Sequence, residues 1–195
     1  MGDIEFKTGT EVVFPDIQDI RNLARNLVQG FFGDPRSADF GGRKEEEEEI
    51  QGAIGRKVNV ITDVIGSDDS VVAVNNGRII GSLGFVELAK MPNGRPIFEL
   101  TAGTVLPEYQ KQGIYPKMYK MIEEKIMAKN PNAVIIAFSR HPDVIEMKKR
   151  RGFKIHTVEE YAKLGKKSFS PELLERLKRD EYVVLIRDPL NESVL

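Results

Sequence analysis

Two long segments of this 195-residue chain carry apolar residues at helical spacing. The first runs from Ile17 to Phe32, and its stripe comprises Ile17, Ile20, Leu23, Ala24, Leu27, Val28 and Phe31. The second runs from Pro116 to Lys129, with Ile114, Met118, Met121, Ile122 and Ile126 on one stripe. Residues three and four apart share a helix face, so each pattern predicts an amphipathic helix that packs on a sheet.

Short apolar runs before and between these segments predict strands. They are Glu11–Phe14, Val71–Val74, Arg78–Val86, Ile97–Leu106, Ala133–Phe138 and Glu181–Arg187. Ala133–Phe138 has no polar alternation, which is typical of a strand buried on both faces of a parallel sheet. Asn76-Gly77 is a strong hairpin signal between the second and third runs. The pattern predicts an α/β fold, and the length predicts one domain over residues 1–195.

The most informative stretch is the turn Gln110–Tyr115, which follows one predicted strand and opens the second long helix. The first N–H groups of a helix have no acceptor within it, and the helix dipole adds partial positive charge there. Such a helix start binds phosphate well. Gly113 lets a ligand approach the backbone closely. The turn therefore predicts a site for a pyrophosphate.

The run Val105–Ile114 resembles the coenzyme A signature of the GNAT N-acetyltransferase superfamily. That signature is Gln/Arg-x-x-Gly-x-Gly/Ala after a strand ending in Val-x-Pro. Gln110 and Gly113 match its first two fixed positions, and Tyr115 stands where the last Gly/Ala is found. The succession of a strand, a charged helix (Asp143–Arg151) and Gly152-Phe153 resembles the second half of the acyl-CoA site, so the resemblance spans residues 71–153.

This resemblance implies a single-domain GNAT-like mixed β-sheet, flanked by helices and splayed between two central parallel strands. It implies acetyl-CoA as the co-substrate and direct acetyl transfer to a primary amine. The residues implied to bind acetyl-CoA are Val105, Gln110, Lys111, Gln112, Gly113, Ile114, Tyr115 and His141.

Acetyl transfer needs a base, because an amine is mostly protonated at neutral pH and its ammonium cannot attack a thioester. Glu99 lies eleven residues before Gln110, a spacing that resembles the catalytic glutamate of histone-type members. A carboxylate is a poor base unless it is partly buried or acts through water. An ordinary polar strand residue is the alternative for Glu99. The backbone N–H of Val105 is the expected donor to the oxyanion.

Lys148 occupies the position where the family usually carries a tyrosine as the general acid. The resemblance therefore does not assign the general acid in this chain. Tyr115, Tyr119 or His141 can substitute, or coenzyme A leaves as a thiolate. We keep Tyr115 among the catalytic candidates. The cationic run Lys148–Arg151 has three interpretations: a solvated helix end, a contact with coenzyme A, or a nucleic-acid patch.

Two segments carry weaker patterns. Arg43 to Lys57 predicts a helix that begins with five glutamates, Glu45–Glu49, which are typical of a solvated face; an acidic rim for a cationic amine is the alternative. Beyond Phe153 no clear period is present up to Lys167, and Ser170 predicts the N-cap of a further helix. We expect this C-terminal segment and the first two helices to determine acceptor specificity.

Composition narrows the alternatives. Lys and Arg total 29 against 30 acidic residues, so no global field recruits nucleic acid or a membrane. No apolar run approaches the ~20 residues of a membrane span, and the N-terminus lacks a signal-peptide profile, so a cytoplasmic location is expected. The chain has no cysteine, which excludes an acyl-cysteine intermediate and a thiolate zinc site. Its two histidines lack metal-ligand spacing, so no catalytic metal is expected.

The sequence leads to three alternatives. The first is an N-acetyltransferase whose acceptor is a small amine, an aminoglycoside, a peptide N-terminus or a protein lysine. The second is a non-catalytic acyl-CoA-binding module with a degenerate site. The third is an α/β protein that binds another phosphorylated ligand. A homodimer stays open.

Overall fold

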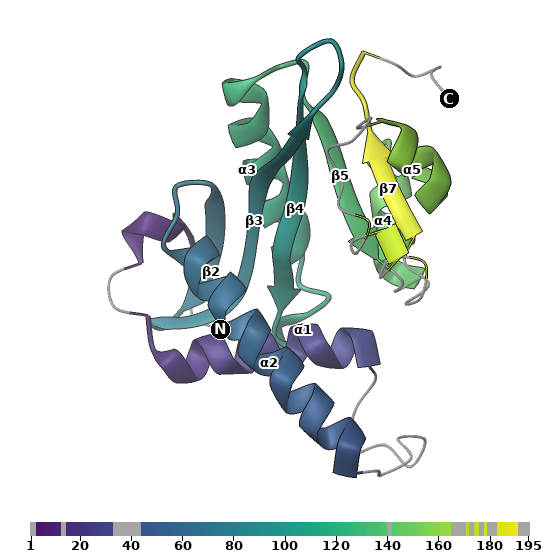
Figure 1. Cartoon of the computed structure of the whole chain (residues 1–195). Coiled ribbons are helices and arrows are strands. Elements are labelled where there is room, and N and C mark those ends of the chain that lie inside the picture. The colour runs from purple at the N-terminus through teal and green to yellow at the C-terminus, as the bar shows by residue number, and fades with distance from the viewer. Residues whose placement is uncertain are drawn as a thin grey trace. The chain divides into compact units, whose positions relative to one another are not determined.

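Seven strands form one mixed sheet in the order β1-β2-β3-β4-β5-β7-β6 (Figure 1). The computed structural model describes residues 3–12, 15–32, 44–139, 142–164, 171, 174–175, 178 and 183–190. The strands are β1 (Ile4–Thr8), β2 (Ser70–Asn75), β3 (Arg78–Lys90), β4 (Pro96–Val105), β5 (Val134–Ser139), β6 (Lys154–His156) and β7 (Val183–Arg187). The helices are α1 (Ile17–Phe32), α2 (Lys44–Ile65), α3 (Ile114–Lys129), α4 (Pro142–Lys149) and α5 (Val158–Leu164), with short 3₁₀ turns η1 (Gly9–Glu11) and η2 (Pro107–Tyr109). None of these helices combines the length and the apolarity that a bilayer span requires.

Several sequence predictions are confirmed. The helix α1 has the predicted bounds, and β5 pairs in parallel with β4. In the turn between β2 and β3, Asn76 and Gly77 have φ of 49° and 78°. Two consecutive positive φ angles are the mark of a type I′ hairpin turn, which is why Asn-Gly is favoured there. The result is the expected mixed α/β architecture.

The predicted first strand is wrong at its start. Glu11 lies in the 3₁₀ turn η1, whereas Val13 and Phe14 lie outside the described residues. The Glu11 carboxylate accepts hydrogen bonds from the Thr8 backbone N–H (2.6 Å) and the Thr8 hydroxyl (2.8 Å), and these bonds hold the turn. The first strand is β1 instead, which pairs antiparallel with β2 from Ile4↔Asn75 to Thr8↔Val71.

Two helices differ from prediction. The helix α2 continues eight residues past Lys57 to Ile65, with Glu45–Glu49 at its start. The segment after Phe153, for which no period was recognised, forms β6 and α5. A capping box starts α5: Thr157 N–H donates to the Glu160 carboxylate (2.8 Å) and Glu160 N–H donates to the Thr157 hydroxyl (3.1 Å). The helix start predicted at Ser170 lies outside the described residues.

The chain divides into two compact units, and the first comprises residues 1–85 and 101–124. Within it α1 packs across α2, as Figure 1 shows. The buried carboxylate of Asp19 on α1 accepts the Ile79 N–H at 2.9 Å and lies 3.5 Å from Arg78 Nε. This contact ties the first turn of α1 to the β2–β3 hairpin.

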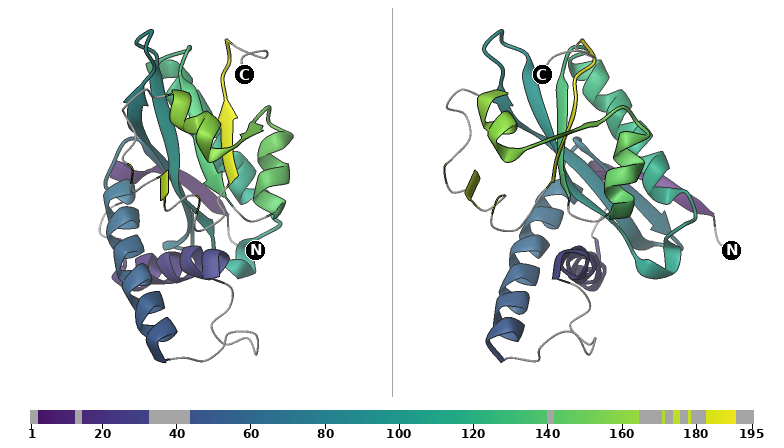
Figure 2. Two further views of the ribbon diagram at one scale, coloured as in Figure 1. Left: turned by 45° about the vertical axis from the view of Figure 1, so that its right-hand side comes forward. Right: turned by 90° about the vertical axis from the view of Figure 1, so that its right-hand side faces the viewer.

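The second unit comprises residues 86–100 and 125–195. Figure 2 shows α4 and α5 on opposite faces of β5 and β7. The core under α5 consists of buried Ile97, Val134, Ile136, Val158, Tyr161, Val184 and Ile186. One sheet face thus forms this core together with α5.

A polar tie in the first unit joins α1 to the end of β4. Asn26 Nδ2 donates to the Thr104 hydroxyl at 2.7 Å and to the Val105 carbonyl at 2.9 Å. Both bonds are partly buried, so solvent cannot fully replace them. The last residues of β4 therefore depend on α1 for their position.

We expect Asn26→Ala to lower the free energy of unfolding by about 1–2 kcal/mol, because it removes two partly buried hydrogen bonds. Asn22→Ala is the matched control on the same helix, since within the described part of the chain the Asn22 side chain makes one exposed hydrogen bond, from Gln18. It should stay within about 0.5 kcal/mol of the unmodified protein. Denaturant titration measures both, and equal values would show that the tie contributes nothing.

Candidate functional site

The strand β4 changes character halfway along its length. Its parallel ladder with β5 runs over three residue pairs, from Ile97↔Val134 to Glu99↔Ile136. Ala102 then has a φ of 51°, an uncommon conformation for a residue with a side chain. The Ser82 hydroxyl is buried and donates to the Ala102 carbonyl at 2.8 Å, which satisfies the group turned aside there. The sequence carried no signal for this kink.

Val105 follows the kink and presents its backbone away from β3. Leu106 N–H donates to the Ile80 carbonyl at 2.9 Å, and successive N–H groups of an extended chain point to opposite edges. The Val105 N–H is therefore directed to the other edge. The Val105 carbonyl accordingly accepts from two side chains, Asn26 and Gln110, the latter at 3.0 Å. Gln110, a predicted cofactor residue, thus holds the strand end as well.

The turn before α3 keeps its backbone donors available. Gln110 N–H donates to the Pro107 carbonyl at 3.2 Å, but the N–H groups of residues 111–114 have no acceptor among the described residues. Lys111 and Gly113 have φ of 60° and 75°, with Gln112 between them outside the positive region. Alternating signs of φ turn consecutive N–H groups toward one spot and form an anion-binding nest. Residues 110–113 are exposed, so a ligand can reach these donors.

Gly113 borders open space. A Cβ built at this position meets no atom within 4 Å. The glycine is therefore required by its backbone conformation and not by packing. A diphosphate fits this turn, since donors, helix dipole and free space coincide at one place.

Tyr115, in the first turn of α3, is half-buried and lies against β4. Its hydroxyl oxygen would be 3.0 Å from a Cβ at Gly103, so a side chain at that strand position would crowd the phenol. The phenol thus lies beside the strand segment between Ala102 and Val105. The first unit thus contains Val105, Tyr115 and the phosphate turn, with the Tyr115 phenol beside Gly103 on the strand that ends at Val105.

Glu99 belongs to the second unit, on the part of β4 that pairs with β5. Its side chain is partly exposed among buried neighbours. Burial raises the pKa of the Tyr161 phenol above its usual value, and the negative charge of Glu99 raises it further. The Glu99 carboxylate and the Tyr161 hydroxyl are therefore electrostatically coupled. Tyr161 was not among the residues predicted from the sequence, although the pattern Thr157-x-x-Glu160 is typical of the start of the helix that carries it.

Lys148 is buried, with 1% of its surface exposed. Its Nζ lies 5.0 Å from the centroid of the Phe153 ring. Burial holds the pKa of the Lys148 ammonium well below its usual range, and the charge of Arg151 acts in the same direction. The interpretation of residues 148–151 as a solvated helix end is thus wrong for Lys148, while Lys149 is exposed and pairs with Glu146 at 2.7 Å.

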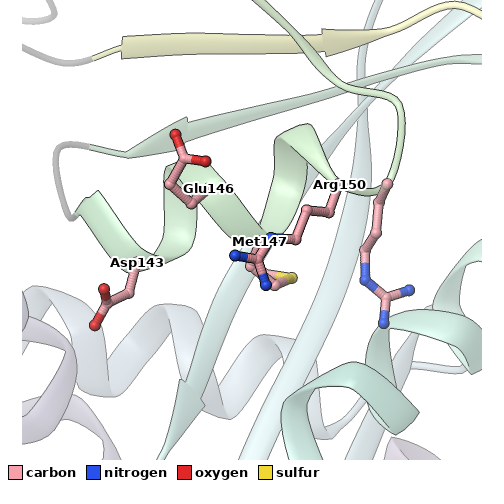
Figure 3. A pocket seen from close by; sticks show the side chains of 5 residues that line it. Asp143, Glu146, Met147 and Arg150 are labelled. Atoms are coloured by element: carbon pink, nitrogen blue, oxygen red, sulfur yellow. The ribbon is translucent and has the colours of Figure 1, made fainter.

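A pocket of about 590 Å³ lies along α4 in the second unit (Figure 3). Its lining residues are Asp143, Glu146, Met147, Arg150 and Arg151. Figure 3 shows the Arg150 side chain extending along the helix toward Met147. His141, predicted to bind the cofactor, lies outside the described residues. No cluster of potential metal ligands occurs in the part of the chain that the structure describes.

No protein-family model and no curated protein matches this sequence. Solved structures do match its fold. The PaiA N-acetyltransferase of Thermoplasma acidophilum, in complex with coenzyme A, superposes with a TM-score of 0.58 and 15% identity, over 95% of this chain and 99% of that chain. The N-acetylglutamate synthase of Neisseria gonorrhoeae, complexed with coenzyme A and N-acetyl-glutamate, superposes with a TM-score of 0.56 and 17% identity, over 96% of this chain and 35% of that chain.

A protein of Desulfovibrio desulfuricans that is assigned to the GNAT family of acetyltransferases is similar at the same level. Its TM-score is 0.55 at 12% identity, over 95% of this chain and 99% of that chain. At such identities the likeness concerns the fold. The strand order, the parallel β4–β5 pair and these superpositions agree that the chain has the GNAT fold.

Proposed function

We propose that this protein is an N-acetyltransferase that moves an acetyl group from acetyl-CoA directly to a primary amine. The observation that carries the proposal is the set of backbone N–H groups at residues 111–114, which have no acceptor within the described structure and surround open space at Gly113. These donors and the start of α3 suit the diphosphate of coenzyme A. The GNAT fold supports the same co-substrate, because solved neighbours carry coenzyme A.

In the proposed reaction Glu99 accepts a proton from the acceptor ammonium, directly or through water. The free amine then forms a C–N bond to the acetyl carbonyl carbon. The Val105 N–H stabilises the oxyanion, a contribution on the order of 3 kcal/mol. Tyr115 donates its phenolic proton to the sulfur as the C–S bond breaks. The attacking nitrogen loses its extra proton to solvent, and solvent returns a proton to the phenol. The chain has no cysteine, so no acyl-cysteine intermediate forms, and the proposed transfer runs directly to the amine.

A non-catalytic acyl-CoA-binding module is the second candidate. It is favoured by Lys148, which stands where the resemblance implies the acid and is buried with a lowered pKa. Such a module binds acyl-CoA at the phosphate turn but does not transfer the acyl group.

Incubation with acetyl-CoA and a panel of amines separates the two candidates. An acetyltransferase releases coenzyme A thiol at a rate that depends on the amine, which a colorimetric thiol reagent detects. The protein contributes no thiol of its own, so its background is nil. Calorimetric binding of acetyl-CoA without thiol release for any amine would favour the module, and absence of binding would exclude both.

We expect Gly113→Glu to abolish acetyl-CoA binding, because the new carboxylate occupies the open space and repels the diphosphate. Gly94→Glu is the matched control: Gly94 also has a positive φ of 83° and no atom within 4 Å of its Cβ position. Both variants carry the same charge and a similar backbone cost of about 1–2 kcal/mol. Calorimetry should show loss of binding for Gly113→Glu alone, and unchanged affinity there would remove the phosphate turn from the proposal.

Glu99→Gln should lower kcat by about 10²- to 10⁴-fold, the usual contribution of a general base, and leave acetyl-CoA affinity unchanged. The substitution preserves size and removes only the charge. Glu87→Gln is the control, since Glu87 is an exposed residue of β3 whose carboxylate lies 3.8 Å from Lys90 Nζ. Steady-state kinetics with an accepted amine measures both, and normal turnover of Glu99→Gln would mean that another group takes the proton.

A further inference from the structure

One sheet face of the second unit surrounds Glu99 with apolar side chains. Ile97 and Glu99 are two residues apart on β4 and therefore point to the same face. Their partners in the ladder are Val134 and Ile136 on β5, and Phe138 is the next residue on that face. Glu99 is thus a carboxylate at the edge of a hydrophobic surface.

The helix α5 covers this face and brings Tyr161 to it. Tyr161 is 0% exposed and belongs to the same core cluster as Ile97 and Ile136. Its ring stands edge-on to Phe138, with centroids 5.4 Å apart and an interplanar angle of 78°. Because Phe138 follows Ile136 on this face, the phenol lies next to the position of Glu99.

A buried phenol requires a polar partner for its O–H group, because an unsatisfied hydroxyl is costly in an apolar core. The other residues of this cluster are apolar, namely Ile97, Val134, Ile136, Val158, Val184 and Ile186, with Leu88, Ala89, Met91, Phe138 and Leu174 packed against it. Glu99 is the carboxylate whose charge acts on the phenol. Geometry and charge therefore join the same two side chains.

We propose that Tyr161 is the positioning residue for Glu99: its hydroxyl dipole, through one bridging water, orients the carboxylate and stabilises its ionised form. The catalytic meaning of this pair rests on the proposed acetyl transfer. The pair itself does not, because it is a property of the folded protein. Tyr161 comes from α5, so the segment after Phe153 contributes to the base and not only to acceptor selection.

Among the residues that the structure describes, the charged groups named below either pair elsewhere or lie away from Glu99. Glu87 and Lys90 of β3 pair with each other, Glu160 of α5 bonds to Thr157, and Glu159 pairs with Lys178 at 3.0 Å. Arg187 of β7 is the ladder partner of Ile135, which points to the opposite face from Ile136. Lys154 and His156 of β6 share the face of Glu99 but lie three strands from β4, about 14 Å at ordinary strand spacing. Lys163 of α5 is exposed.

The direct test is the pKa of the Glu99 carboxyl in the full chain, measured by NMR titration of protein labelled with ¹³C at glutamate carboxyls. Glu99→Gln assigns the resonance. A donor to the ionised form lowers the pKa of a carboxyl, so Tyr161→Phe should raise that of Glu99 by about one unit. The substitution removes a single oxygen and keeps the ring against Phe138. An unchanged titration would overturn the inference.

Glu160→Gln is the matched control. It removes a negative charge from the residue next to Tyr161 and retains the oxygen that accepts the Thr157 N–H, so the titration of Glu99 should not move. The reciprocal measurement uses Glu99→Gln, which leaves α5 unaltered and should change the chemical shift of Tyr161 Cζ. No change there would also contradict the coupling, whether or not Tyr161→Phe folds well.

Kinetics then links the pair to catalysis. Tyr161→Phe should lower kcat about tenfold, the usual effect of losing a hydrogen bond to a charged group, with KM for acetyl-CoA unchanged. The acid limb of the pH profile should move to higher pH by the same amount as the NMR titration. A protein that shows the NMR shift but acetylates no amine would contradict the proposed function and retain the pair. Normal acetylation with an unchanged titration of Glu99 would support the proposed function and contradict the Tyr161–Glu99 pair.

Discussion

The candidate site depends on a requirement of backbone chemistry: every N–H group needs an acceptor, and the turn before α3 offers several N–H groups that have none among the described residues. The alternating φ signs at Lys111, Gln112 and Gly113 turn these donors away from the protein. The first N–H groups of any helix have no acceptor within the helix. Here the N–H groups of residues 111–114 have no acceptor among the described residues. A ligand with anionic oxygens is the group that completes this region best.

The strand β4 carries Glu99 and Val105 and runs into this turn through η2, so these candidate residues lie on one continuous stretch of chain. Its ladder with β5 ends at Glu99, and side chains satisfy carbonyl groups of its second half. Ser82 satisfies the carbonyl at the Ala102 kink, and Asn26 with Gln110 satisfies that of Val105. Where β4 no longer pairs with β5, side chains satisfy its carbonyl groups, and the Val105 N–H is directed away from β3.

Burial disfavours the charged forms of two polar groups of the second unit. The ammonium of Lys148 is disfavoured by desolvation, and the phenolate of Tyr161 is disfavoured by desolvation and by Glu99. The Lys148 amine beside the Phe153 ring and the Tyr161 phenol, which the Glu99 charge reaches, bear differently on the proposed chemistry. The first replaces a tyrosine that the family resemblance implies, while the second provides a hydroxyl from an element that the resemblance does not include.

Local sequence was sufficient for α1, for the Asn76-Gly77 hairpin, for β5 and for the phosphate turn, because their signals lie in consecutive residues: a period, a turn dipeptide, an apolar run, a glycine at a helix start. The extent of α2 and the place of the first strand were missed, since Ile4–Thr8 becomes a strand by pairing with β2, more than sixty residues later. The kink at Ala102 and the approach of Tyr161 to Glu99 also needed the fold. Both arise from partners that are distant in sequence, Ser82 across the sheet and α5 over its face, and no local period records such partners.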